Sequence, residues 1–268
     1  MLATRLLTVA LALPLFLAAL FLLPRTGWVL CLLPALLLGA REWGSLAGYE
    51  RPGAWTYAGV TAAAAAALAY VGHSEGMPSP LQLVAYGTGT AFWLVLAPFW
   101  LRAQWHVRGP ALAVAGWIVL IPMWLALVEM QSIAPVLLAF LGVVWIADTA
   151  AYLAGRQWGR HKLAPSISPG KTWEGVAGAA AGVFIYYALL QGFVDNPHPA
   201  LSGVEGALLF AILLGLSIEG DLFESWIKRQ AGVKDSGRLL PGHGGVLDRI
   251  DGLTATLPIV ALCVHYLR

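Results

Sequence analysis

Nine apolar segments constrain the fold of this chain more than any other feature. They cover residues 6–23, 27–41, 54–72, 81–101, 111–129, 134–154, 173–192, 203–223 and 252–267. A helix that crosses a bilayer needs about 20 predominantly apolar residues, and most of these segments approach that length. Only 11% of the residues are charged, too few to cover the water-facing surface of a soluble protein of this size. The sequence therefore predicts an all-α polytopic membrane protein with about nine transmembrane helices.

The positions of the basic residues predict how these helices are oriented. If all nine segments cross the membrane and the N-terminus is cytoplasmic, all but two of the 16 Lys and Arg residues are cytoplasmic. The two exceptions are Arg25 and Arg268. Cytoplasmic loops normally carry such an excess of Lys and Arg. We therefore expect an integral protein of the cell (inner) membrane. Its net charge of only +2 gives no reason to expect nucleic acid as a partner.

The polar residues divide the chain into two parts. Residues 1–133 have few ionisable groups within their apolar segments, so we expect them to form a scaffold of transmembrane helices. Residues 134–268 contain two cytoplasmic loops, 155–172 and 224–251, around which most of the ionisable groups concentrate. Ionisable residues at membrane depth are costly and usually functional. We expect this second part to be catalytic and to form a polar cavity that faces the cytoplasm.

The first polar segment has features of a phosphate-binding site. A Pro-Gly turn places Lys171 and neighbouring hydroxyl groups at the start of a helix, where the dipole and free N–H groups favour phosphate oxygens. The segment is not a P-loop, because that pattern requires glycine at position 165 and this chain has proline there. The candidate residues of this segment are Asp148, Ser168, Lys171, Thr172 and Glu174.

The second polar segment combines an acidic and basic helix face with a glycine-rich turn. Residues spaced by three or four, such as Asp221, Ser225 and Lys228, fall on one face of a helix. Glycines around His243 allow backbone N–H groups to converge on an anion. The candidate residues of this segment are Asp221, Ser225, Lys228, Arg229, Lys234, His243, Gly244, Gly245, Asp248, Arg249 and Asp251.

These residue types indicate chemistry on phosphates. Aspartates without a His/Cys cluster favour Mg²⁺, which usually binds one or two carboxylates together with substrate phosphates. Basic side chains would neutralise those phosphates. The residues therefore predict Mg²⁺-dependent phosphoryl or nucleotidyl transfer between a water-soluble phosphate compound and a lipid. A lipid or polyprenol kinase fits them equally well. A cation-coupled transporter would more often place its carboxylates at mid-membrane on interrupted helices.

One long motif runs through the second polar segment. It reads Ser225-x-Ile227-Lys228-Arg229-x4-Lys234-Asp235-x-Gly237 and continues as Pro241-x-His243-Gly244-Gly245-x2-Asp248-Arg249-x-Asp251. The first polar segment adds Asp148-Thr149-x2-Tyr152 and Ser168-Pro169-Gly170-Lys171-Thr172-Trp173-Glu174-Gly175. Together these motifs resemble the phosphatidate cytidylyltransferases, also called CDP-diacylglycerol synthases, over residues 148–251.

The resemblance implies a specific reaction of phospholipid biosynthesis. In it, CTP and phosphatidic acid give CDP-diacylglycerol and pyrophosphate. The resemblance also implies an all-helical fold with a cytoplasm-facing polar cavity, a homodimer, and a metal centre whose ligands fall on Asp221 and Asp248. We expect Mg²⁺ there, and the sequence leaves open whether a second, monovalent cation assists. Asp148, Lys171, Glu174 and Asp251 are then expected to position the substrates.

Overall fold

The computed structural model describes residues 2–71, 78–193, 198–237 and 244–266, and nearly all of them lie in helices. The helices are α1 (Leu2–Leu22), α2 (Arg25–Leu46), α3 (Arg51–Val71), α4 (Pro80–Ala91), α5 (Ala97–Ala103), α6 (Gly109–Glu129), α7 (Ala134–Trp158), α8 (Trp173–Phe193), α9 (Gly203–Gln230) and α10 (Leu247–Tyr266). A π-helical segment, Phe92–Leu96, joins α4 to α5, and a 3-10 turn, Met130–Ile133, joins α6 to α7. Another 3-10 turn, Pro199–Leu201, precedes α9. Helices thus occur over each of the nine apolar segments.

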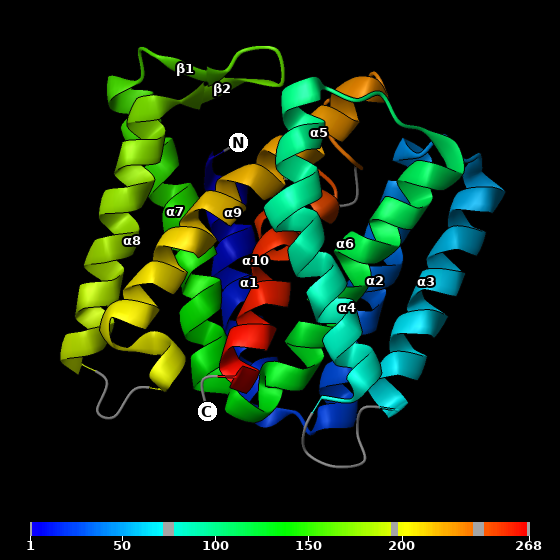
Figure 1. Cartoon of the computed structure of the whole chain (residues 1–268), viewed down its shortest axis with the longest axis horizontal. Helices are drawn as coiled ribbons and strands as arrows, with labels where there is room; N and C mark the ends of the chain where they lie inside the picture. The colour runs from blue at the N-terminus through cyan, green and yellow to red at the C-terminus, as the bar shows by residue number, and fades with distance from the viewer. Residues whose placement is uncertain (1, 72–77, 194–197, 238–243, 267–268) are drawn as a thin grey trace.

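Within the described part of the chain, six helical stretches are long and apolar enough to cross a membrane. They are Arg25–Leu46, Arg51–Val71, Pro80–Ala103, Gly109–Trp158, Trp173–Phe193 and Gly203–Gln230. The 50-residue stretch covers both α6 and α7, which Figure 1 shows as separate helices in different parts of the bundle. Stretches of this length and composition are those of an integral membrane protein.

The last helix, α10, lies at the centre of the bundle (Figure 1). It packs against α9, α6, α4 and α7. Helices α3 and α8 lie on opposite outer sides of the molecule. Few residues of α8 are buried, whereas α10 is buried along most of its length. The first carboxylates of α10 are therefore held at the centre, where several helices can reach them.

Small residues let α7 and α8 approach closely. A β-carbon added at Gly182 of α8 would lie 2.9 Å from the β-carbon of Ala150 in α7. One turn earlier, a β-carbon added at Gly178 would lie even closer to the β-carbon of Ala154. Close packing of glycine against alanine is typical of helix pairs in membranes, where attraction comes from direct contact. This pairing fixes the two helices that lead into and out of the first polar segment.

The segment between α7 and α8 forms a β-hairpin, which the prediction of an all-helical chain does not include. Its strands are β1 (Lys162–Ala164) and β2 (Ser168–Thr172), and they pair antiparallel. Lys162 is opposite Thr172, and Ala164 is opposite Ser168. Such short polar strands lack the alternation of apolar residues by which a strand is recognised in a sequence. The hairpin lies beyond the ends of α7 and α8 and extends towards α5 (Figure 1).

Candidate active site

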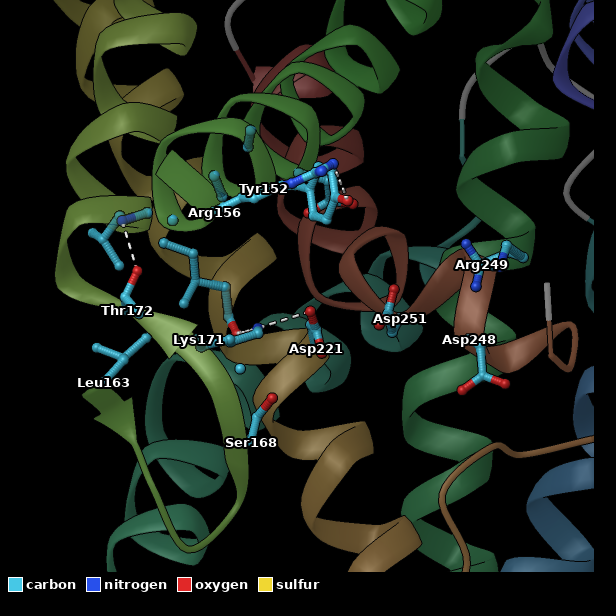
Figure 2. Close-up of a pocket in the computed structure, with 18 of the residues that line it drawn as sticks. Tyr152, Arg156, Leu163, Ser168, Lys171, Thr172, Asp221, Asp248, Arg249 and Asp251 are labelled. Atoms are coloured by element: carbon cyan, nitrogen blue, oxygen red, sulfur yellow. Dashed lines mark hydrogen bonds and ion pairs between the residues drawn. The ribbon is translucent and has the colours of Figure 1, made fainter. Parts of the chain in front are cut away.

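A cavity of about 600 Å³ lies between α7, the hairpin, α9 and α10 (Figure 2). This volume is within the range of small-molecule sites. Four acidic and four basic side chains meet there, together with hydroxyl groups. The polar residues that line it are Asp148, Tyr152, Arg156, Ser168, Lys171, Thr172, Asp221, Lys228, Asp248, Arg249 and Asp251. The two polar segments of the sequence therefore form one site.

Asp221 of α9 joins that helix to the hairpin. One of its oxygens lies 2.8 Å from Nζ of Lys171, and the other accepts a hydrogen bond of 3.3 Å from the Ser225 hydroxyl. Lys171 also donates to the carbonyl oxygen of Ile218. The ammonium group of Lys171 is partly exposed to the cavity. It is therefore placed where it can exchange a carboxylate for a phosphate oxygen.

Lys228 lies on the same face of α9, two helical turns after Asp221, and is buried. Its Nζ is 2.7 Å from an oxygen of Glu224 and 2.5 Å from an oxygen of Asp248. A buried charge is costly unless it is paired and hydrogen-bonded, and these two carboxylates meet that need. The ion pairs connect α9 to the start of α10. In this arrangement Lys228 holds carboxylates in place at the wall of the cavity.

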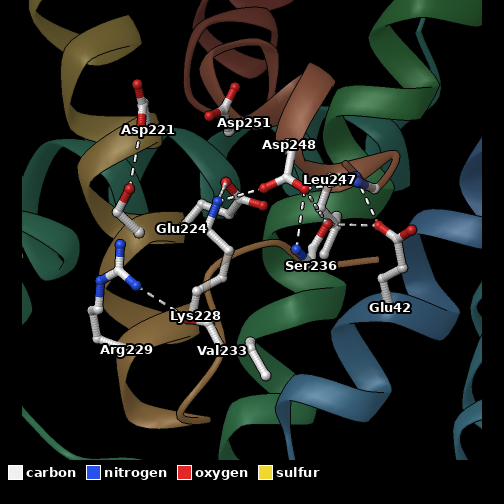
Figure 3. A network of polar contacts seen from close by, with 12 residues as sticks. Glu42, Asp221, Glu224, Lys228, Arg229, Val233, Ser236, Leu247, Asp248 and Asp251 are labelled. Atoms are coloured by element: carbon white, nitrogen blue, oxygen red, sulfur yellow. Dashed lines mark hydrogen bonds and ion pairs between the residues drawn. The ribbon is translucent and has the colours of Figure 1, made fainter. Parts of the chain in front are cut away.

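Asp248 is fixed by contacts to both of its oxygens (Figure 3). One oxygen binds Lys228, and the other accepts hydrogen bonds from the backbone N–H groups of Gly245, at 2.7 Å, and Ser236, at 3.1 Å. The Ser236 hydroxyl lies 3.1 Å from the same oxygen. Gly244, whose φ of +82° disfavours residues with a side chain, brings the glycine turn against this carboxylate. The backbone N–H groups of Gly245 and Ser236 therefore hold Asp248 in place.

Asp251 follows one helical turn after Asp248. Figure 2 shows it between Asp221 and Asp248. One of its oxygens accepts a hydrogen bond of 2.9 Å from the N–H of Gly252. A β-carbon at Gly220 would lie only 2.5 Å from the backbone carbonyl oxygen of Asp251. Glycine at this position lets α9 and α10 cross closely enough to bring these carboxylates together.

At the start of α8, two residues of the first motif form hydrogen bonds within the protein. The hydroxyl of Thr172 accepts a hydrogen bond from the N–H of Gly175 and thereby satisfies one of the free donors of the first turn. Glu174 is turned towards His161, binding its backbone N–H and lying 2.7 Å from its Nδ1. Glu174 therefore does not line the cavity, although the sequence suggests it as a positioning residue.

Several residues predicted from the second segment also lie outside the cavity lining. Ser225 hydrogen-bonds Asp221, as described above. Arg229 donates to the carbonyl oxygen of Ile167, which connects α9 to the hairpin. It also donates to the carbonyl oxygen of Val233. Lys234 is exposed. Gly244 and Gly245 contact Asp248 rather than the cavity itself. His243 lies outside the described residues.

The structure adds residues that the predicted site lacks. Arg156 and Tyr152 line the cavity and are joined by a hydrogen bond of 3.3 Å. Glu224 completes the ion pairs of Lys228. Glu42 of α2 is buried and accepts hydrogen bonds from the backbone N–H groups of Val246 and Leu247, at the start of α10. The sequence offers one signal for Glu42, since a carboxylate near the end of an apolar segment is unusual.

The oxygen atoms around the cavity fit a hard divalent cation. Among the described residues, no group of three or more His, Cys, Asp and Glu residues could hold a metal ion by itself. Mg²⁺ does not need such a group, because it is usually bound by one or two carboxylates, water and substrate phosphates. Asp221 and Asp248 both line the cavity and supply carboxylates of this kind.

Comparison with known proteins gives consistent results over the whole chain. Residues 3–267 match the Cytidylyltransferase family. The phosphatidate cytidylyltransferase of Pseudomonas aeruginosa is 39% identical over 266 residues, which is 97% of this chain and 96% of that protein. The protein of the same name from Brucella suis is 51% identical over 121 residues, covering 45% of this chain and 43% of that protein. The chain therefore belongs to the Cytidylyltransferase family.

Proposed function

We propose that this protein is a phosphatidate cytidylyltransferase, which converts CTP and phosphatidic acid into CDP-diacylglycerol and pyrophosphate. The observation that carries this conclusion is a cavity lined by aspartates and basic side chains, in an apolar helical protein of the Cytidylyltransferase family. Such a cavity suits a nucleotide and a lipid phosphate, whose negative charges need basic partners. The apolar helices around it suit the acyl chains.

In the proposed reaction, an oxygen of the lipid phosphate attacks the α-phosphorus of CTP in line, and pyrophosphate leaves. No general base is needed, because a phosphate monoester is largely ionised near neutral pH. The residues of the site instead position the reactants and stabilise charge. Lys171, Arg156 and Arg249 line the cavity and are suited to the phosphate oxygens. Lys228 is already engaged by two carboxylates and is suited to holding them.

We also propose that Mg²⁺ takes part, held by Asp221 and Asp248 together with substrate phosphates. When bound, it would neutralise negative charge on the transferring group and on the departing pyrophosphate. The support is the type of donor, since both residues offer carboxylate oxygens at the wall of one cavity. Asp148 and Asp251 line the same space and would help to set the position of the nucleotide.

We further propose nine transmembrane helices, with the N-terminus and the cavity on the cytoplasmic side of the inner membrane, and a homodimer. The number of helices is supported by helices over all nine apolar segments. The orientation is supported by the distribution of the 16 Lys and Arg residues. The homodimer rests on the resemblance of the motifs alone.

The proposed reaction is distinguished from that of a lipid kinase by the phosphorus atom that is transferred. Purified protein is given phosphatidic acid, Mg²⁺ and CTP labelled at either the α or the γ position. We expect label to enter the lipid from the α position only, with release of pyrophosphate. Diacylglycerol should not replace phosphatidic acid, because its hydroxyl lacks the ionised oxygen of the lipid phosphate. Transfer of label from the γ position would identify a kinase and contradict the proposal.

A further inference from the structure

Glu42 is a buried carboxylate that comes from outside the polar segments of the sequence. It lies near the end of α2 and is only 3% exposed. Its two oxygens accept hydrogen bonds from the backbone N–H groups of Val246, at 3.1 Å, and Leu247, at 3.0 Å. These donors stand at the beginning of α10, where N–H groups have no partner within the helix. The negative charge of Glu42 also suits the positive end of the helix dipole.

The same carboxylate is linked to Asp248 through one serine. The hydroxyl of Ser236 lies 2.8 Å from an oxygen of Glu42 and 3.1 Å from an oxygen of Asp248 (Figure 3). A serine hydroxyl has a single hydrogen to donate, so the shorter distance assigns that hydrogen to Glu42. The backbone N–H of Ser236 remains on Asp248. Glu42 therefore holds both the residue that donates to Asp248 and the helix end that carries it.

Two glycines of the long motif leave room for this carboxylate. A β-carbon added at Gly237 or at Gly245 would overlap the carboxylate group of Glu42. Neither glycine has a positive φ, so backbone conformation does not require glycine there. The space that Glu42 occupies does require it. Gly237 and Gly245 are thus packed against a side chain that reaches them from α2.

We infer that Glu42 is a positioning residue for the proposed transfer reaction. It clamps Ser236 and the start of α10, and through them it fixes the carboxylate of Asp248 at the wall of the cavity. This inference rests on the proposed function, because its consequence is a rate of CDP-diacylglycerol formation. Glu42 itself does not line the cavity and touches no reacting atom.

The test compares Glu42→Ala and Glu42→Gln with Trp43→Phe in the purified full chain. Trp43 is the neighbouring buried residue of α2, and its indole N–H donates to the carbonyl oxygen of Leu112, away from the turn. We expect Glu42→Ala to lower kcat by about 100-fold, since a misplacement of about 1 Å can cost that much. Glu42→Gln keeps one acceptor oxygen and should lie between Glu42→Ala and wild type. Trp43→Phe should stay near the wild-type kcat. In the two Glu42 variants, KM should change less than kcat.

Hydrogen exchange supplies a readout that does not depend on activity. In wild-type protein the amides of Val246 and Leu247 should be protected. Their exchange should accelerate by about tenfold in Glu42→Ala, as expected for loss of a hydrogen bond to a charged acceptor. In Trp43→Phe it should remain at the wild-type rate. A double mutant of Glu42→Gln and Ser236→Ala should lose less activity than the product of the two single losses, because both changes break the same link.

Two results would overturn the inference. One is unchanged exchange at Val246 and Leu247 in both Glu42 variants, which would mean that the clamp does not hold the helix end. The other is faster exchange with a kcat equal to that of Trp43→Phe, which would make Glu42 a purely structural residue. If wild-type protein forms no CDP-diacylglycerol, the proposed function fails and the catalytic part of the inference with it. Exchange would distinguish this case, because it reports on the clamp alone.

Discussion

Of the carboxylates that line the cavity, Asp248 accepts the most of the hydrogen bonds described above. Lys228 binds one oxygen, and the Gly245 and Ser236 N–H groups converge on the other. Such a group has its position set before substrate arrives. Preorganised charge of this kind is most effective in stabilising a transition state, because no reorganisation is needed during the reaction.

Replacement of Asp248 by asparagine tests this role. The change keeps the shape of the side chain but removes its charge. It also places an NH₂ group where Asp248 accepts hydrogen bonds. We expect the rate of CDP-diacylglycerol formation at saturating Mg²⁺ to fall by much more than tenfold. The protein should still be folded at the assay temperature, as thermal unfolding will show. Glu205→Gln, in an exposed residue of the first turn of α9, should leave the rate unchanged. If Asp248→Asn kept more than about a tenth of the rate, less than about 1.4 kcal/mol of transition-state stabilisation would have been lost, and the residue would be structural.

Helices α9 and α10 carry most of the acidic residues of the cavity, so their separation decides how far apart these residues lie. The close approach at Gly220 sets that separation. By contrast, a β-carbon at Gly215, in the same helix, would meet nothing within 4 Å. The two glycines therefore offer a matched pair of substitutions in one element.

Gly220→Ala should destabilise the protein and lower its activity. The added methyl group must push α10 away, and overpacking of this kind costs about 1–3 kcal/mol. Gly215→Ala should instead be neutral or stabilising, because alanine stabilises a helix by up to about 1 kcal/mol relative to glycine. Thermal unfolding and the rate of CDP-diacylglycerol formation measure both variants. Equal unfolding temperatures for the two would show that the crossing at Gly220 is not tightly packed.

The orientation of the whole molecule can be tested with two serine-to-cysteine substitutions. Ser166 lies in the hairpin and Ser132 in the turn between α6 and α7, and both are exposed. In a background with Cys31 and Cys263 replaced by alanine, we expect an impermeant thiol reagent to label Ser166→Cys only from the cytoplasmic side. Ser132→Cys should react only from the opposite side. Labelling of both from the same side would mean that α7 does not cross the membrane and would contradict the nine-helix topology.

The parts of the structure that depend on local sequence are the parts that the sequence predicts. Hydropathy is a local property, so the helices lie where the apolar segments lie. The spacing of Asp221 and Lys228 correctly indicates a helical face, because α9 continues through both. The hairpin escapes prediction because its strands are short and polar. The contact of Glu174 with His161 and the role of Glu42 escape prediction because both depend on tertiary partners, which for Glu42 are N–H groups at the start of α10.

The position of Glu42 has a consequence for how the protein is made. Its contact with Leu247 joins residues separated by 205 positions, so translation delivers the carboxylate long before its partner. A nascent chain that ends before Val246 has Glu42 but none of the helical N–H groups that bind it. The site can therefore be completed only after the last helix has left the ribosome and entered the centre of the bundle. Such a long-range contact forms late and slowly during folding, because the long stretch of chain between the two residues must first be ordered. A ribosome-bound intermediate in the membrane would accordingly contain nearly every helix and still have no assembled catalytic centre.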